Sequence, residues 1–223
     1  RKAEELIEIY GVKSVNKCYV PKFSDMPFPF AVCINVNSVI VHGFHSEYIL
    51  AEGDIVSYDL GIIDSFGNCA DAAITVPVGE ISIAKKRLLY YAYQTMQVAV
   101  SLLVPGANTE SIARQINQFA ALRGYKVNRR QGGHAIGKEM HEKPNIYNSV
   151  EPHHIYAILN EGQVFCVEPI LTYGNDDMGV MDVNGWTYRT GDNKPSAFFE
   201  VMVKVTKAGP QILTNHIKNV PSL

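Results

Sequence analysis

The sequence predicts an α+β fold in which two blocks of strands flank a pair of helices. Strand-like alternation recurs in the first and last thirds of the chain, and two helical patterns lie between them. Each strand block carries two acids within otherwise apolar strands: Asp59 and Asp71 in the first, Glu168 and Glu200 in the second. This order suggests two related halves that share one group of four acidic residues, although no clear residue-level repeat supports it.

The first third is expected to begin with the end of a helix at residues 1–10, which Gly11 stops. Residues 31–37 alternate between apolar and polar side chains and predict a strand. Residues 39–41 are expected to be its partner after a turn, and His42 then leaves the sheet.

A second pair of strands is predicted at residues 55–60 and 71–78, joined by a turn centred on Ser65. Such a hairpin would place Asp59 directly opposite Asp71. Cross-strand side chains lie about 5 Å apart, and like charges there are destabilising. We therefore expect a shared proton or a bound cation to offset the repulsion.

The middle of the chain predicts two helices, at residues 83–104 and 109–123. Asn108 is expected to cap the second helix and Gly124 to end it. Each pattern has one apolar face at helical spacing, which we expect to be buried. These faces consist of Leu89, Ala92, Met96, Ala99 and Leu103 in the first helix and of Ile112, Ile116 and Phe119 in the second.

The last third is expected to return to strands. Residues 163–171 predict a strand that carries Glu168, and residues 198–205 predict one that carries Glu200. Between them, Asn184-Gly185 is typical of a tight hairpin turn joining two short strands.

Two histidines, His134 and His141, lie seven residues apart in a glycine-rich segment closed by Pro144. A metal-binding pair on a helix would need a spacing of four, and an uninterrupted strand would place the two imidazoles on opposite faces. If both serve one site, we expect them to reach it from a strand end and the following loop. That loop is expected to run through Tyr147 and His153.

Composition argues against several classes of protein. The net charge of −2 argues against a nucleic-acid partner, which usually requires a basic face. No apolar run approaches the roughly 18 residues of a membrane span, and no secretory leader is evident, so no membrane partner is expected. The four cysteines include no Cys-x-x-Cys pair and are expected to be reduced thiols in a cytoplasmic protein.

Carboxylates inside apolar strands are costly to bury, so they pair, keep their protons or bind metal. The alternative is that each acid caps a strand or meets a surface lysine. The four acids Asp59, Asp71, Glu168 and Glu200, taken with the imidazole of His134, suit Mn, Fe, Co or Zn. Two such ions would need carboxylates that bridge them.

Several stretches carry a family resemblance. They are Asn37-Ser38-Val39-Ile40-Val41-His42-Gly43, Gly53-Asp54-Ile55-Val56-Ser57-Tyr58-Asp59, Gly67-Asn68-Cys69-Ala70-Asp71, Gly133-His134-Ala135-Ile136-Gly137, Met140-His141-Glu142-Lys143-Pro144, Val167-Glu168-Pro169, Asn184-Gly185-Trp186-Thr187 and Phe199-Glu200. With them the chain resembles the methionine aminopeptidases of bacterial type 1, in the family that also contains aminopeptidase P and prolidase. The similarity begins at about residue 30 and continues to the C-terminus.

The resemblance implies the pita-bread fold, in which two pseudo-symmetric α/β halves surround a dinuclear metal site. It implies that Asp59 holds the second of two divalent ions and that Asp71 and Glu200 bridge both. His134 and Glu168 would complete the coordination of the first ion.

The same resemblance implies roles at the substrate. His42 and His141 match two catalytic histidines that face the scissile peptide without binding metal. Glu168 would pass a proton from the attacking water to the leaving amine. The pocket for the methionine side chain would be formed by Cys33, Phe28, Met140 and Trp186.

Five positions depart from the family pattern. Ala135 stands where glycine is usual, Val201 where histidine is usual, and Gly61 where threonine is common beside the metal floor. Asp25 replaces an aromatic residue of the pocket, and Met140 replaces a frequent phenylalanine. None removes a ligand, so we expect metal binding to survive, whereas turnover and side-chain preference are open.

We therefore expect one catalytic domain over residues 1–223, with a longer natural N-terminus left open because the chain lacks an initiator methionine. Its expected function is metal-dependent removal of N-terminal methionine from nascent polypeptides whose second residue is small. The expected cofactors are two divalent ions, and the expected partners are peptide N-termini, with a ribosome contact left open, for a monomer. The alternatives are a proline-directed aminopeptidase or dipeptidase of the same fold and a non-catalytic peptide-binding relative.

Overall fold

The structure is a computed structural model that describes residues 1–20, 26–44 and 47–222. Its helices are α1 (Lys2–Ile9), α2 (Ile83–Ser101) and α3 (Thr109–Ala121). Its strands are β1 (Lys13–Ser14), β2 (Cys33–Val36), β3 (Val39–Val41), β4 (Ile55–Ile63), β5 (Cys69–Pro77), β6 (Lys126–Val127), β7 (Gly132–Ala135), β8 (Glu142–Tyr147), β9 (Val164–Val167), β10 (Ile170–Thr172), β11 (Val180–Met181), β12 (Tyr188–Arg189), β13 (Ser196–Phe198), β14 (Val201–Lys204) and β15 (Gln211–Ile212). The predicted order of strands, two helices and strands is confirmed.

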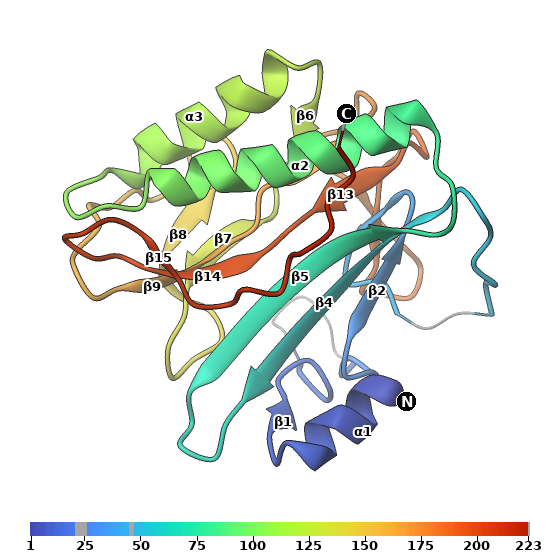
Figure 1. Cartoon of the computed structure of the whole chain (residues 1–223), viewed down its shortest axis with the longest axis horizontal. Helices are drawn as coiled ribbons and strands as arrows, with labels where there is room; N and C mark the ends of the chain where they lie inside the picture. The colour runs from blue at the N-terminus through green and yellow to red at the C-terminus, as the bar shows by residue number, and fades with distance from the viewer. Residues whose placement is uncertain (21–25, 45–46, 223) are drawn as a thin grey trace.

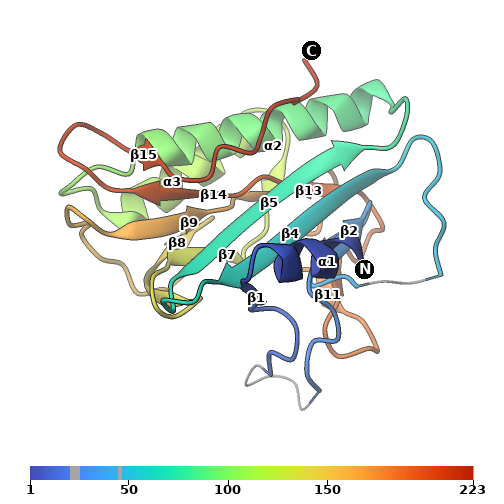
Figure 2. The same cartoon turned by 60° about the horizontal axis from the view of Figure 1, so that its bottom comes forward.

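The strands of the described residues form four antiparallel sheets. Their orders are β1-β4-β2 with β5 also on β4, β15-β14-β9-β7-β8, β13-β10-β6 and β11-β12-β3. Helices α2 and α3 lie side by side over one side of the strands, and α1 lies near β1 at the opposite side (Figures 1 and 2). The molecule is therefore a layer of helices on a set of strands.

The main core lies between the two long helices and the strands beneath them. All five residues of the predicted α2 face are fully buried, as are Ile112 and Ile116 of α3. Phe119 is only half-buried, and the Arg123 guanidinium lies 3.4 Å from the centre of its ring. Asn108 caps α3 as predicted, since its Oδ1 accepts a hydrogen bond from the backbone N–H of Glu110 at 2.8 Å. Within the described residues, no helix is long and apolar enough to cross a lipid bilayer.

The β4–β5 hairpin brings the first acid pair together, but in a different register from the predicted one. Asp59 pairs with Ala73, and Asp71 pairs with Gly61. The turn is centred one residue later because the Asp64 carboxylate accepts hydrogen bonds from the N–H groups within it. A shift of two positions keeps both acids on one face, so they are diagonal neighbours instead of direct partners.

The second acid pair lies where two strands pass from one sheet to another. The predicted strand 163–171 breaks at Glu168 into β9 and β10, and the predicted strand 198–205 breaks before β14. β9 and β14 pair in the five-stranded sheet, and β10 and β13 pair in a three-stranded sheet. At the break, the Glu200 N–H donates to the Ala73 carbonyl at 3.0 Å. Both glutamates are therefore held at the junction of the two sheets, next to β5.

Two further predictions of local structure are wrong. β3 does not pair with β2, because β2 hydrogen-bonds to β4 and β3 to β12. The segment after His141 is a strand, β8, which pairs with β7 before the chain reaches the loop at His153. The polar composition of β8 hid this strand, whereas the hairpin predicted at Asn184-Gly185 is confirmed by the β11–β12 pair.

We predict that Leu89→Ala in α2 lowers the free energy of unfolding by about 2–5 kcal/mol, because it leaves a cavity in a packed core. Leu122→Ala is the control, since this side chain is 75% exposed. Its effect should stay within about 0.5 kcal/mol. Urea denaturation of both variants measures the difference. Equal losses would contradict the assignment of α2 to the core.

Candidate metal centre

The five predicted metal ligands line one cavity of about 280 Å³. Asp59 and Asp71 project from neighbouring strands β4 and β5, and His134 comes from β7. Glu168 follows β9, and Glu200 precedes β14. Residues far apart in the sequence thus meet at one place, where the long hairpin crosses the junction of the two sheets.

Three of these residues form a tight group with a fourth that the sequence did not identify. One ligand atom from each of Asp71, His134, Glu200 and Cys166 lies within 4.8 Å of the others. All four residues are buried. The sequence could have indicated Cys166, because it lies two residues before Glu168 in the predicted strand. Side chains two residues apart in a strand point to the same face.

His134 is oriented to offer one ring nitrogen to the cavity. Its Nδ1 lies 3.0 Å from the Ala135 carbonyl oxygen, which places the ring proton on Nδ1. Nε2 then carries the lone pair and lies 3.8 Å from Oε1 of Glu168. Burial lowers the pKa of His134 to about 4, so the imidazole is neutral at physiological pH. This is the state in which histidine binds a metal.

The carboxylates are held where ionisation is costly. Burial raises the pKa of Asp59 to about 6. Burial and then the charge of Asp59 raise the pKa of Asp71 well above its ordinary range. Burial, followed by the neighbouring carboxylates, has the same effect on Glu168 and Glu200. Among the described residues, no lysine or arginine forms an ion pair with any of these acids.

The residues present fit a divalent metal ion. Glu200 is only 1% exposed, and its buried Oε1 has no hydrogen-bond partner among the described residues. A buried acceptor without a partner costs free energy that a cation would offset. One neutral imidazole with several carboxylates is a donor set for ions such as Mn, Fe, Co or Zn. The alternative, that each acid meets a surface lysine, is not what the described residues show.

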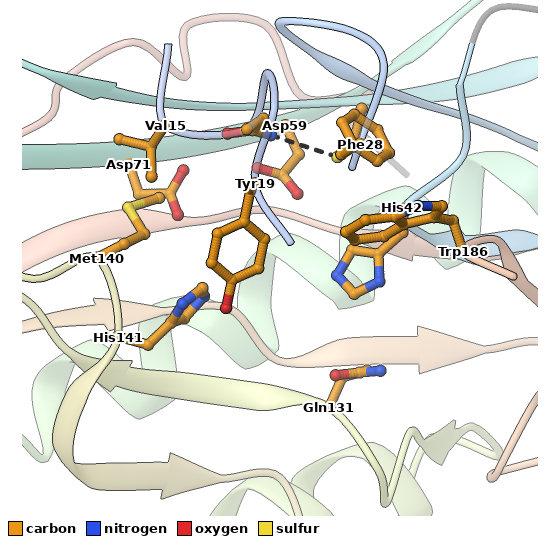
Figure 3. Close-up of a pocket in the computed structure, with 12 residues that line it drawn as sticks. Val15, Tyr19, Phe28, His42, Asp59, Asp71, Gln131, Met140, His141 and Trp186 are labelled. Atoms are coloured by element: carbon orange, nitrogen blue, oxygen red, sulfur yellow. Dashed lines mark hydrogen bonds between the residues drawn. The ribbon is translucent and has the colours of Figure 1, made fainter. Parts of the chain in front are cut away.

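A second cavity, of about 230 Å³, opens beside the first (Figure 3). It shares Asp59 and Asp71 with the first cavity. All six residues predicted to contact the substrate line it: Phe28, Cys33, His42, Met140, His141 and Trp186. Phe28 and Trp186 meet edge to face at 5.1 Å between ring centres, which gives this cavity an aromatic wall.

The two histidines outside the predicted ligand set stand at the boundary between the cavities. His42 and His141 line both of them. Burial, followed by the proximity of His141, lowers the pKa of His42 to about 4, and burial lowers the pKa of His141. His42 has a φ of 56°, which is rare for a residue other than glycine and typical of functional sites. His141 reaches the site from the turn before β8, with its ring centre 4.5 Å from that of His134, as the sequence predicted.

The N-terminal segment supplies pocket residues that the sequence did not reveal. Tyr19 projects into the mouth of the pocket between His141 and Trp186, with ring centres 6.3 and 6.5 Å away (Figure 3). Asn16 donates from Nδ2 to the sulfur of Cys33 at 3.4 Å, and its Oδ1 accepts from a backbone N–H of β4. No local pattern marks these residues, because they lie in a loop-like stretch and reach the site only by tertiary packing.

The departures from the family pattern have different outcomes. Gly61 and Met140 are complementary: a Cβ on Gly61 would lie 2.3 Å from Cε of Met140. The methionine thus occupies space that a larger residue at position 61 would fill. Ala135 and Val201 are both buried. Asp25 lies outside the described residues.

Comparison with known proteins gives a consistent result. Residues 2–207 match metallopeptidase family M24. A methionine aminopeptidase from Aquifex aeolicus is 36% identical over 214 residues, which are 95% of this chain and 82% of that protein. A methionine aminopeptidase from Clostridium perfringens is 34% identical and covers 96% and 82% of the two chains.

Solved structures show the same likeness. The structure of methionine aminopeptidase from Thermotoga maritima superimposes with a TM-score of 0.86 at 32% identity, covering 95% of this chain and 82% of that one. Prolidase from Pyrococcus horikoshii gives a TM-score of 0.74 at 22% identity, with 98% of this chain against 53% of that one. The latter likeness shows the fold alone, and both agree with the predicted pita-bread architecture.

We predict that metal binding releases protons and weakens as the pH falls below about 6. The raised pKa values keep these carboxylates partly protonated in the metal-free protein, and an ion must displace those protons. His134, with a pKa of about 4, contributes almost nothing above pH 5. Calorimetric titration with Mn²⁺ at pH 6, in two buffers of different ionisation enthalpy, should show release of about one proton or more per ion. Binding without proton release would contradict the buried, protonated acids.

The same pKa shifts make a prediction for the stability of the metal-free protein. The folded-state pKa of Asp59 lies above its ordinary value, so its contribution to stability is present at low pH and lost as the pH rises through about 6. Buried neutral His42 acts in the opposite sense, because its contribution is lost as the pH falls through about 4. Excess Mn²⁺ should therefore raise the midpoint temperature of thermal unfolding more at pH 7 than at pH 5.

We predict that Gly61→Ala destabilises the protein by about 1 kcal/mol, because the added methyl group displaces the flexible end of Met140 and crowds Oδ1 of Asn16 at 2.9 Å. In a Met140→Ala background the same substitution should cost less, since the overlapping Met140 atom is gone. Urea denaturation of the two single variants and the double variant gives the coupling free energy, expected at about 0.5 kcal/mol or more. Additive costs would show that the two residues do not share this space.

Proposed function

The chain belongs to metallopeptidase family M24, and on this premise we propose that it hydrolyses the peptide bond after an N-terminal methionine. The observation that supports this most strongly is the meeting of two cavities at Asp59 and Asp71. One cavity is lined by the five potential metal ligands, and the other has the aromatic and sulfur-containing walls that suit a methionine side chain.

We assign the metal to Asp59, Asp71, His134, Glu168 and Glu200, with two divalent ions as the complete complement. Asp71 and Glu200 would bridge the ions, since Asp71 is a neighbour of Asp59 on one side and Glu200 lies within the Asp71–His134 group on the other. When bound, such ions supply a water of lowered pKa and polarise the scissile carbonyl.

The protein's own residues supply the proton transfers and the orientation of the substrate. Glu168, which lines the same cavity as the other potential ligands, would accept the proton of the attacking water and pass it to the leaving amine. A neutral His141 can donate one N–H to the oxygen of the scissile carbonyl, where negative charge develops. His42, on the same boundary, would contact the nitrogen of that bond.

Removal of a single residue follows from where the acids lie. Asp59 and Asp71 line the side-chain pocket, so a methionine placed there would have its free α-amino group next to the ion that Asp59 would hold. A chain continuing on the N-terminal side would bring an amide nitrogen to the same place, and an amide nitrogen has no available lone pair for a metal. This arrangement favours an exopeptidase.

The remaining parts of the proposal concern the setting of the reaction. The substrate would be nascent polypeptides with a small second residue, processed in the cytoplasm. Residues 1–223 would act as one catalytic domain and as a monomer. The near-neutral charge offers little attraction for nucleic acid.

The alternatives have less support. The chain spans 53% of the Pyrococcus horikoshii prolidase, at 22% identity, whereas it spans 82% of two methionine aminopeptidases at 34–36% identity. A non-catalytic binding relative would be expected to lose ligands. In this chain all five potential ligands line the same cavity.

We predict that chelated protein does not release methionine from Met-Ala-Ser and that Mn²⁺, Fe²⁺ or Co²⁺ restores the release. The reason is that the carboxylate cluster requires a divalent ion both to form the site and to activate water. Chromatographic detection of free methionine across a metal series, with Met-Leu-Ser as the bulky comparison, measures this. Met-Ala-Ser should be cleaved faster than Met-Leu-Ser.

Asp71→Asn tests the role of Asp71 as a ligand, because it keeps the size of the side chain and removes its charge. It should lower kcat/KM by about 100-fold or more while the far-ultraviolet circular dichroism stays unchanged. Retained turnover would rule out Asp71 as a bridging ligand. Cleavage of Xaa-Pro peptides in place of Met-Ala-Ser would support the proline-directed alternative.

A further inference from the structure

Cys166 is the member of the buried donor group that the five-ligand assignment leaves unused. It lies on β9, directly between its partner His134 on β7 and its partner Met202 on β14. Directly paired residues of antiparallel strands present their side chains on the same face. Glu168 follows two residues later, just past the end of β9. The thiol therefore points to the side of the sheet from which the predicted ligands project.

Distances and burial agree with this placement. The sulfur lies within 4.8 Å of a ligand atom of each of Asp71, His134 and Glu200. Cys166 is fully buried, so no water competes for its sulfur from outside. Donors around a tetrahedral Zn²⁺ lie roughly 3.3–3.5 Å apart, given bonds of about 2.0 Å to N or O and 2.3 Å to S. Pairs of these donors, at up to 4.8 Å, would thus need to approach each other by at most about 1.5 Å to share one ion.

A second observation points to a ligand at this place. Oε1 of Glu200 is buried without a hydrogen-bond partner among the described residues, next to the thiol. No basic side chain of the described residues pairs with Glu200 or Asp71. The thiol lies within hydrogen-bonding reach of the Glu200 carboxylate, so the group combines a soft donor with one oxygen, Oε1, that has no partner. A thiophilic cation satisfies both.

Packing alone explains Cys166 less well. Its apolar neighbours include Cys69, Ile136 and Met202, and a small hydrophobic residue would fill the same space. Cys69 belongs to the same apolar cluster but is not part of the donor group. The chain thus contains two buried cysteines in one cluster, and only Cys166 has its sulfur among the ligand atoms.

We propose that the sulfur of Cys166 coordinates the first ion in addition to His134, Asp71, Glu168 and Glu200, so that this chain binds that ion through mixed sulfur, nitrogen and oxygen donors. On coordination a sulfur–metal bond forms, the S–H bond breaks, and the proton passes to solvent without any change of oxidation state. A sulfur donor shifts selectivity toward Zn²⁺, Co²⁺ or Cd²⁺ and away from Mn²⁺. The inference rests on the divalent-metal site proposed above.

Cobalt spectroscopy tests the sulfur bond directly. The metal-free protein is titrated with one equivalent of Co²⁺ without oxygen. The wild type should show a sulfur-to-cobalt charge-transfer band in the near ultraviolet together with the visible bands of bound Co²⁺. Cys166→Ser should keep the visible bands and lose the charge-transfer band.

Two matched variants show which thiol is responsible. Cys69→Ser removes the neighbouring buried thiol, and Cys33→Ser removes the thiol that lines the substrate cavity near Asp59. Both should retain the band. Loss of the band in either of them, with retention in Cys166→Ser, would overturn the proposal.

A measurement on the wild type keeps the test valid if Cys166→Ser does not fold. X-ray absorption of protein carrying one equivalent of Zn²⁺ should show a sulfur shell at about 2.3 Å in addition to nitrogen and oxygen at about 2.0–2.2 Å. A shell of nitrogen and oxygen alone would overturn the proposal. Where the variant folds, its affinity should fall about tenfold or more for Zn²⁺ and by a much smaller factor for Mn²⁺.

The two proposals fail in different ways. Bound Co²⁺ with visible bands but no sulfur band would overturn only the role of Cys166 and leave the five-ligand site in place. Absence of Co²⁺ binding, measured by equilibrium dialysis, would overturn the metal site and the role of Cys166 together.

Discussion

The mutual repulsion of buried carboxylates is the constraint on which the rest of the structure depends. Asp59, Asp71, Glu168 and Glu200 line one cavity without a basic side chain of the described residues to pair with them. Their charged forms are costly to bury, and a bound cation removes most of that cost. The metal is therefore as much a structural requirement of this site as a catalytic one.

The fold holds these acids together by strand pairing, which is strong and directional. A long hairpin fixes Asp59 and Asp71, while two strands change sheets at Glu168 and Glu200. Helices α2 and α3 cover the strands and bury a large apolar core between them. The free energy gained by this burial offsets the free-energy cost of burying the four acids. The apolar core that stabilises the fold and the sheet junction that carries the candidate ligands thus lie at different places on the same strands.

The substrate side depends on neutral groups close to charged ones. Burial keeps His42 and His141 uncharged. They can therefore donate hydrogen bonds beside the candidate metal ligands without adding positive charge that would repel an ion. Met140 lies over Gly61, next to the acid pair, and gives the pocket a flexible thioether wall.

Local patterns in the sequence determined the helices and indicated the acids and His134 as candidate ligands, because helical periodicity, caps and short motifs depend on residues close in the chain. Phe119 was predicted to be buried but is only half-buried, and its ring lies against the Arg123 guanidinium. Only the tertiary structure decided the diagonal placement of Asp59 and Asp71, the pairing of β8 and the entry of Tyr19 into the pocket. It also placed the sulfur of Cys166 within 4.8 Å of potential ligand atoms of Asp71, His134 and Glu200. Each of these depends on contacts between distant segments, or on hydrogen bonds within a turn, that periodicity does not encode.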